Sequence, residues 1–409
     1  MTYRRAAIPA VAGGLLLTAL LWWAGASVSV LHLQGATDTL GGRLVADLQY
    51  WLSPWSYDPP GSAAFGPGEP GGADASRYRT LHATAMQIRF AALFAFFVPG
   101  ALLLVRRLPP VNGRTSVLLP ALWAWGMAAG ALAATVSAPW LIASHGRGSY
   151  RVLPQLAGMA SSGQQITVPV SFVTAVVIVL VARITTEGAS TPPLATVSRR
   201  AARLAATVGT AVVALSLVVL SYESVAASIQ TAWVSGGLLA EPGDLLRAWL
   251  LLGGWSSPPS GAVGGSVGQW ALYRLADALV LVVVWWALRL LPARLTRASL
   301  PAMAVGGFCA TVIGLLASQL FQSVVIGADT GGRWAWQYLQ GALGGHVPAA
   351  LTWGLLAGLI TGTVLRLAGG HAEAAGTGTP APPDPPLPPV PPAPPVAPAK
   401  ADRPDRPVG

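Results

Sequence analysis

The sequence contains very little cysteine, histidine or charge. One of its 409 residues is cysteine and five are histidine. A single cysteine excludes a disulfide framework, a Cys-based zinc site and an Fe–S cluster within one chain. The histidines are scattered, without an HExxH pattern or clustered carboxylates, so no metal site is expected. No P-loop or dinucleotide-binding glycine pattern occurs either. We therefore expect no cofactor and no enzymatic activity.

The scarcity of charge defines the class of protein. Charged residues make up 10% of the chain and hydrophobic residues 53%, and the mean hydropathy is +0.56. A soluble globule with a polar surface could not have this balance. The sequence thus predicts an all-α polytopic transmembrane helical bundle, with the lipid bilayer as its first partner.

Hydropathy predicts about eight spans, each close to the roughly 20 residues that cross a bilayer. We expect the second span, which is the shortest, to extend back toward Met86. The first span is read as retained and not as a cleaved signal peptide. The predicted spans are 7–33, 90–105, 116–144, 166–182, 204–221, 270–291, 300–326 and 347–367.

The arginines predict the orientation. If the N-terminus lies inside, 16 of the 25 Lys and Arg residues and only five of the 15 acidic residues are cytoplasmic. This is the positive-inside rule, and it accounts for the net charge of +10 without nucleic acid as a partner. We therefore expect a multi-pass protein of the plasma (inner) membrane with both termini in the cytoplasm.

Matching patterns recur in the same order along the two halves of the chain. Each half has a Trp-Ser motif in its first outer loop, an arginine opening its second span, Leu-Pro-Ala near its third span, Gly-Arg before its fourth span and then Val-Pro. This order predicts a tandem duplication of a four-span unit. The predicted parts are a first repeat (1–184), a cytoplasmic linker (185–200), a second repeat (201–368) and a tail (369–409).

Two long outer segments, 34–86 and 223–269, contain short apolar patches at 44–52 and 245–252. Each patch is expected to form a short helix at the outer interface, where Trp and Tyr are at home. Alternatively, both segments cap a central vestibule with Trp55 and Trp255 as equivalent anchors. Residues 61–76 are rich in Gly and Pro, and we expect a mobile loop there.

Three charged side chains fall near or within the spans. Arg89 and Arg274 occupy equivalent places, and the simplest interpretation is that both extend to the lipid head groups. Asp277 has no acidic counterpart in the first half, where Ala92 takes its place. It lies three residues after Arg274, so an ion pair within the helix is available. The alternative is a proton- or cation-binding role for Asp277 in the pathway.

Polar residues also crowd the seventh span, where Gln319 and Gln322 either bond to another helix or line a cavity. The spacing of Gly354 and Gly358 would allow close helix pairing, which leaves a homo-oligomer open. The proline-rich tail is expected to be extended and disordered. It serves as a spacer or binds a protein partner that recognises polyproline.

The end of the first span, Leu31-His32-Leu33-Gln34-Gly35-Ala36, is followed by a Gly-rich outer loop, and the chain ends in a Pro-rich tail. In these features the chain resembles the streptophobe family, actinobacterial integral membrane proteins of very high hydrophobicity. The resemblance implies an inner-membrane location and no assigned activity.

Two functional hypotheses follow from the sequence. Parallel repeats occur in transporters, where the substrate path runs between the halves. The first hypothesis is thus a secondary transporter or permease-like protein with Arg89, Arg274 and Asp277 around that path. The second is a membrane scaffold that recruits partners through its outer loops and tail. An enzyme acting on lipid-linked substrates fits less well, because no acid/base pair can be assigned.

Overall fold

The structure is a computed structural model of the whole chain. It describes residues 3–33, 35–58, 73–108, 115–144, 162–186, 198–221, 267–295, 299–327 and 333–376, together with the single residues 156, 159, 225 and 228. The chain divides into two units, residues 1–369 and 370–409. The following account concerns the first unit.

The described residues form helices and short turns without a strand, which confirms the predicted all-α class. Eight helices among them are long and apolar enough to cross a membrane, so the chain is a multi-pass membrane protein. They are α1 (Tyr3–Ala26), α5 (Ala73–Arg107), α6 (Thr115–Ser144), α8 (Gln164–Thr186), α9 (Arg199–Ser221), α12 (Val267–Arg294), α13 (Leu300–Gly327) and α14 (Arg333–Gly376). The short elements are α2 (Val28–Leu31), α3 (Ala36–Leu40), α4 (Gly42–Leu52) and the 3-10 turn η1 (Ser53–Trp55).

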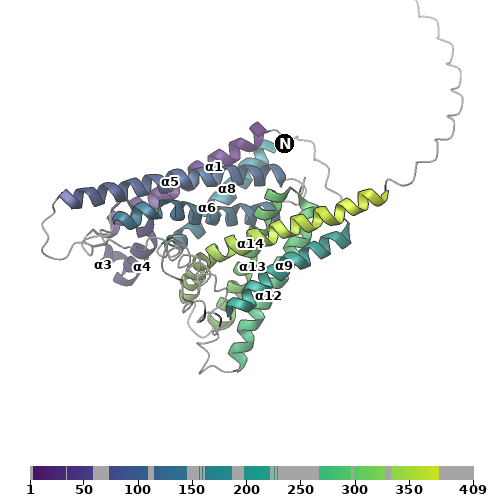
Figure 1. Cartoon of the computed structure of the whole chain (residues 1–409). Coiled ribbons are helices and arrows are strands. Elements are labelled where there is room, and N and C mark those ends of the chain that lie inside the picture. The colour runs from purple at the N-terminus through teal and green to yellow at the C-terminus, as the bar shows by residue number, and fades with distance from the viewer. Residues whose placement is uncertain are drawn as a thin grey trace, which may run out of the picture. The chain divides into compact units, whose positions relative to one another are not determined.

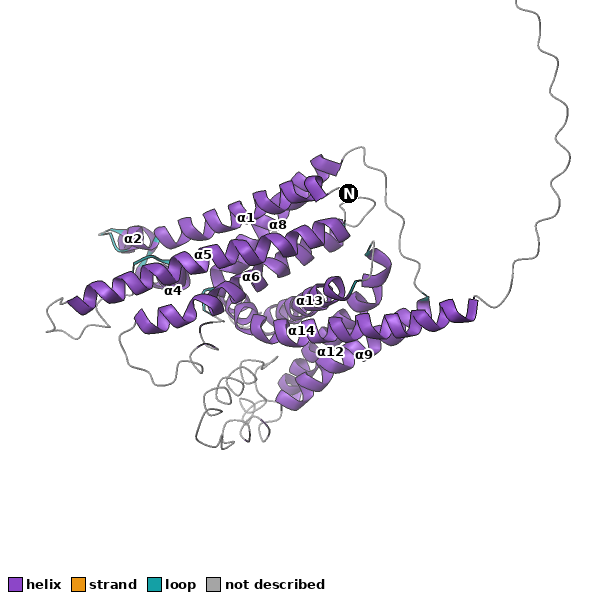
Figure 2. Ribbon diagram, turned by 45° about the horizontal axis from the view of Figure 1, so that its top comes forward, coloured by secondary structure: helices purple, strands orange, loops and turns teal. Residues whose placement is uncertain are grey.

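The long helices lie in two groups of four. Helices α1, α5, α6 and α8 lie side by side in Figures 1 and 2, and α9, α12, α13 and α14 form the second group. In the first group α1 packs against α5 and α8, and α6 also packs against both. In the second group α12 packs against α9 and α13, while glycine contacts join α14 to both of those helices. The same ring of neighbours therefore occurs in each group.

Glycines bring α13 and α14 into close contact. A Cβ atom added at Gly354 would come within 2.7 Å of the Cα atom of Phe308, and one added at Gly358 would overlap the carbonyl oxygen of Met303. Small residues at such positions let helix backbones approach and gain van der Waals contact, which is the main attraction between helices in lipid. Gly354 and Gly358, whose spacing left a homo-oligomer open, therefore pack against another helix of the same chain.

The two groups meet where α13 lies against α6 and α5. The thiol of Cys309 on α13 donates to the carbonyl oxygen of Ala121 on α6, at a sulfur–oxygen distance of 3.3 Å. One continuous cluster of buried apolar side chains runs through both groups. The boundary between the groups is therefore packed, apart from the cavity described below.

Part of the first outer segment forms a small subdomain against the first group. The predicted helix at 44–52 is present as α4, which buries Val45 and Leu52. The last four residues of the predicted loop at 61–76 belong to a helix, because α5 begins at Ala73. The rest of that predicted loop lies outside the described residues. So does the second outer segment up to residue 266, apart from residues 225 and 228.

Most of the long helices extend a few residues beyond their predicted spans, and two of them, α5 and α14, begin more than ten residues early. The predicted second span began at Phe90, but α5 runs through 35 residues from Ala73 to Arg107. Helix α14 has 44 residues and ends at Gly376, within the stretch assigned to the tail. The remaining tail residues, 377–409, lie outside the described residues.

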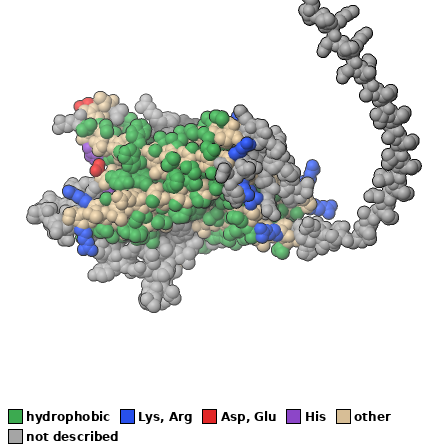
Figure 3. Space-filling view, turned by 90° about the horizontal axis from the view of Figure 1, so that it is seen from above, with side chains coloured by type: hydrophobic (Ala, Val, Ile, Leu, Met, Phe, Trp, Pro, Cys, Tyr) green, Lys and Arg blue, Asp and Glu red, His purple; other side chains and the backbone are tan. Residues whose placement is uncertain are grey.

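The surface agrees with a membrane location. In Figure 3 hydrophobic side chains cover the middle of the molecule, and the Lys and Arg side chains lie toward its ends. Large apolar side chains are exposed on this surface, including Trp23 (66%) and Ile184 (70%). Exposed apolar area on this scale is stable when lipid covers it.

Candidate functional site

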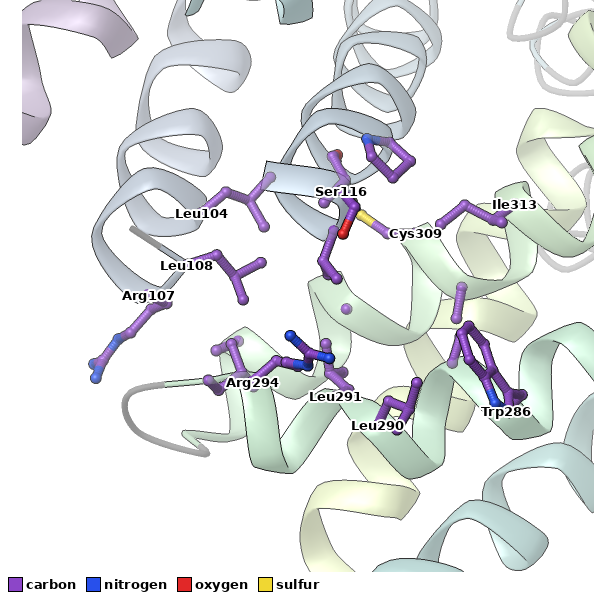
Figure 4. A pocket seen from close by; sticks show the side chains of 18 of the residues that line it. Leu104, Arg107, Leu108, Ser116, Trp286, Leu290, Leu291, Arg294, Cys309 and Ile313 are labelled. Atoms are coloured by element: carbon purple, nitrogen blue, oxygen red, sulfur yellow. Dashed lines mark hydrogen bonds between the residues drawn. The ribbon is translucent and has the colours of Figure 1, made fainter. Parts of the chain in front are cut away.

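The boundary between the two groups contains a cavity of about 190 Å³. Its walls are the last turns of α5 and α12, the first turns of α6, and the first half of α13 (Figure 4). Each group thus contributes two helices. Because the lining helices come from both halves of the chain, any movement of one group against the other would change the shape of the cavity.

The lining is almost entirely apolar. Leucines, alanines and valines dominate it, and Trp286 and Ile313 contribute larger surfaces. Within the described part of the chain, the few polar or ionisable groups of the lining are Arg107, Ser116, Arg294 and the Cys309 thiol, and none of its residues is acidic. A site of this composition favours a molecule that is mostly apolar and carries negative charge at one end.

The two arginines lie at one end of this cavity. The side chain of Arg294 reaches toward the space, whereas that of Arg107 points away from it in Figure 4. Neither guanidinium group has a hydrogen-bond or ion-pair partner among the described residues. Both lie in the last turns of their helices, where a basic side chain also interacts favourably with the helix dipole.

The cavity is small for a complete ligand but large for a packing defect. Pockets for drug-sized molecules usually measure about 300–1,000 Å³, and an apolar cavity of about 150 Å³ can hold benzene. A space of about 190 Å³ therefore accommodates part of a larger molecule, such as a segment of an alkyl chain. Trp286 lines the space and is also 60% exposed, so one wall of the cavity borders the outer surface.

A second polar feature lies farther along α12, toward its other end. Arg274 Nη1 lies 3.1 Å from Asp277 Oδ2, which gives the predicted ion pair within the helix. The two side chains are 29% and 7% exposed, respectively, so the carboxylate is the more deeply buried partner. Burial of a carboxylate is costly unless a charge and hydrogen bonds compensate it, and Arg274 supplies that charge.

The register of α12 and α13 places Asp277 near the polar part of α13. Gly306 faces Leu291, and Gly314 faces Val280, so the two helices run antiparallel. Continuing this register brings Asp277 opposite the turn that contains Ser318. Each polar side chain of this turn, namely Ser318, Gln319 and Gln322, is 3% exposed.

The glutamines were expected to bond to another helix or to line a cavity. Gln322 Nε2 lies 3.5 Å from Ser318 Oγ, one turn earlier in the same helix, and Gln319 Oε1 has no hydrogen-bond partner among the described atoms. Neither glutamine lines the cavity described above. The polar turn and the cavity are thus separate features of the α12–α13 pair.

Arg89 does not extend to the head groups, and that interpretation is wrong. Its side chain is completely buried, and Nε donates to Ser137 Oγ on α6 at 2.9 Å. Nη1 donates to the carbonyl oxygen of Pro54, and the guanidinium lies 5.5 Å from the centre of the Trp55 ring. Arg89 therefore joins α5, α6 and η1 within the first group.

Trp55 lies buried beside Arg89. Its indole Nε1 donates to the carbonyl oxygen of Gly163, just before α8, at 3.0 Å. A Cβ atom at Gly25 would overlap the carbonyl oxygen of Trp55, so α1 also passes close to this residue. Trp55 thus packs the first outer segment against α1 and the start of α8. Its proposed counterpart, Trp255, lies outside the described residues.

The sequence interpretation missed the cavity and its two arginines. The sequence counts Arg107 and Arg294 only among the 16 basic residues expected on the cytoplasmic side. Hydropathy places residues along the membrane normal and does not show which helices are neighbours. A possible signal was their equivalent position at the end of the second span of each half.

Comparisons with protein-family models, with curated proteins and with solved structures found no match.

Proposed function

We propose that the chain is a secondary transporter or permease-like protein whose path follows the boundary between the two groups of helices. The observation that carries this proposal is the cavity lined by α5, α6, α12 and α13. Substrate sites of transporters built from repeats lie at the interface between repeats, because relative motion of the repeats can expose the site to either side.

The lining indicates the kind of solute. An almost wholly apolar wall offers few hydrogen-bond partners, so a small polar solute would lose its hydration without gaining hydrogen bonds in return. An amphiphilic solute could place its apolar part in the cavity and keep its polar end beside Arg107 and Arg294. We therefore propose an amphiphilic substrate. The absence of a P-loop motif fits transport driven by a gradient.

The polar features have separate roles in this proposal. Asp277 and the polar turn of α13 lie along the same helix pair as the cavity, at the other end of α12, and are the candidates for ion coupling. Arg89 is removed from the path, since its described partners all belong to the first group.

Transport can be tested with NBD-labelled phospholipids in proteoliposomes that contain the full chain. Dithionite bleaches only the label in the outer leaflet, so a protein that moves the label across the bilayer allows bleaching beyond the outer-leaflet fraction. We expect faster movement than in protein-free liposomes. Labelled phosphatidylcholine and phosphatidylglycerol should both be tried.

Locking the boundary provides the matched test. Ala121→Cys adds a second thiol opposite Cys309, and a short bis-methanethiosulfonate reagent should join the two groups. Cross-linking should stop movement of the label, and reduction should restore it. Ala121→Cys combined with Cys309→Ala controls for the reagent. The proposal is contradicted if no label moves, or if movement continues in the cross-linked protein. The scaffold hypothesis would then be tested by removing residues 370–409 and measuring the loss of a bound partner.

A further inference from the structure

The cavity lies beside two arginines, Arg107 and Arg294, that have no partner among the described residues. We propose that the cavity holds a segment of one acyl chain of an anionic phospholipid from the surrounding bilayer, whose phosphate is bound by Arg294 and Arg107. This inference goes beyond transport, since a resident lipid would bind whether or not any solute moves between the groups.

The size and lining of the cavity argue for an acyl chain. About 190 Å³ of apolar space suits a few methylene groups, and filling it would restore dispersion contacts that its walls lack. Trp286 lies in the wall and is 60% exposed, so the space borders the lipid-facing surface. A chain from a neighbouring lipid could therefore enter from the side without passing through water.

The charges argue for an anionic head group. Arg294 and Arg107 both line the cavity, and none of the described residues that line it is acidic. A guanidinium group binds phosphate oxygens through two parallel hydrogen bonds, and its long stem lets it move to meet a head group. Arg294 already reaches toward the space, whereas Arg107 points away from it and has to change rotamer to meet the same phosphate.

The predicted orientation agrees with this ligand. The helix ends that carry Arg107 and Arg294 are those that the positive-inside rule assigns to the cytoplasmic leaflet. Basic pockets between transmembrane helices on that side are suited to anionic head groups. A lipid bound here would touch helices of both groups and would stabilise their contact.

Quenching of tryptophan fluorescence by brominated lipids tests the site. The full chain is placed in phosphatidylcholine nanodiscs that contain either dibrominated phosphatidylglycerol or dibrominated phosphatidylcholine at the same mole fraction. The chain has 16 tryptophans, so the signal of Trp286 is taken as the difference between the unchanged protein and Trp286→Phe. We expect the anionic lipid to quench this signal at concentrations lower by a factor on the order of ten.

Variants of the arginines assign the preference to the site. Arg294→Gln and Arg107→Gln should each reduce the preference about threefold or more, the double variant should abolish it, and Arg294→Lys should retain part of it. Arg366→Gln is the matched control, because Arg366 is exposed near the end of α14 and does not line the cavity. Ala310→Leu, which fills the space from α13, should weaken quenching by both lipids.

Equal quenching of Trp286 by the two lipids would overturn the proposal, because ordinary contact with the bilayer gives that result. An unchanged preference in the double arginine variant would overturn it as well. The outcome is independent of the dithionite assay. If the protein binds the anionic lipid but moves no label, the lipid site stands and the transport proposal is contradicted. If it moves the label without preferring the anionic lipid, transport stands and the lipid site is contradicted.

Discussion

Arg89 Nε on α5 donates a hydrogen bond to Ser137 Oγ on α6 across 2.9 Å, and both side chains are completely buried. No carboxylate among the described residues pairs with this guanidinium. Its charge is therefore stabilised by neutral groups, namely the Ser137 hydroxyl, the Pro54 carbonyl oxygen and the face of Trp55. Neutral acceptors and an aromatic face can hold a buried guanidinium in this way.

Ser137→Ala should destabilise the protein, because it leaves Arg89 Nε without an acceptor. Loss of a hydrogen bond to a charged group costs about 1.5–3 kcal/mol. The free energy of unfolding can be measured by titration with sodium dodecyl sulfate in mixed micelles. Thr363→Ala serves as the control, since the Thr363 hydroxyl is exposed and bonds only to the preceding turn of its own helix. Equal effects of the two changes would contradict the role given to Ser137.

Gly163→Ala should also destabilise the protein. Gly163 has φ +74°, and an added Cβ atom would lie 2.7 Å from Trp55 Nε1 and 3.0 Å from Pro54 Cβ. The left-handed conformation alone costs an alanine about 1–2 kcal/mol. Gly42→Ala is the matched control, because nothing lies within 4 Å of a Cβ atom there. We expect a lower melting temperature in detergent for the first variant and little change for the second.

Arg89 and Arg274 show what the sequence could and could not predict. Their equivalent places along the second span of each half predict equivalent roles. In α12, Asp277 provides a carboxylate one turn after Arg274, and the predicted ion pair forms. In α5, the corresponding position is Ala92, so Arg89 takes its partners from α6 and η1. Interactions within one helix follow from spacing, whereas those between helices depend on packing that the sequence does not display.

The helix ends show the same limit. Hydropathy located all eight long helices, because each needs an apolar stretch that spans the hydrocarbon. It could not find the start of α5, where Thr80, Thr84 and Gln87 make the sequence polar while the backbone stays helical. His82 in this part is buried, with Nε2 3.1 Å from the carbonyl oxygen of Ser56. Contact with the outer segment therefore accompanies the extension of the helix beyond its apolar core.

Gly358→Ala should separate packing within the chain from oligomer formation. The added methyl group would overlap the backbone of Met303 and Ala304 on α13, and such overpacking costs about 1–3 kcal/mol. Gly362→Ala is the control, because its Cβ atom would lie no closer than 3.1 Å to Leu300 Cδ2 and Met303 Cβ, which is a tight contact but not an overlap with backbone. We expect Gly358→Ala to lower the melting temperature more than Gly362→Ala without changing the mass of the purified particle. A change of mass with unchanged stability would instead assign Gly358 to an interface between copies.

Asp277 is the side chain on which ion coupling depends in our proposal. Its carboxylate is 7% exposed and lies 3.1 Å from Arg274 Nη1, and the register of α12 and α13 brings it near the polar turn at Ser318. Asp277→Asn keeps the size of the side chain but removes its charge and its capacity to exchange a proton. In liposomes loaded with a pH-sensitive dye, we expect the full chain to conduct protons down an imposed gradient and Asp277→Asn to lose that conduction.

Two further variants separate coupling from structure. Asp38→Asn should conduct like the unchanged protein, because Asp38 is exposed in α3 outside the long helices. Arg274→Gln removes the partner of the carboxylate and leaves the exchangeable proton site in place. If the pair is purely structural, Arg274→Gln and Asp277→Asn lower the melting temperature alike, and conduction is the same in every folded variant. If Asp277 carries the proton, conduction is lost in Asp277→Asn and persists in Arg274→Gln, because only the carboxylate can accept and release the proton.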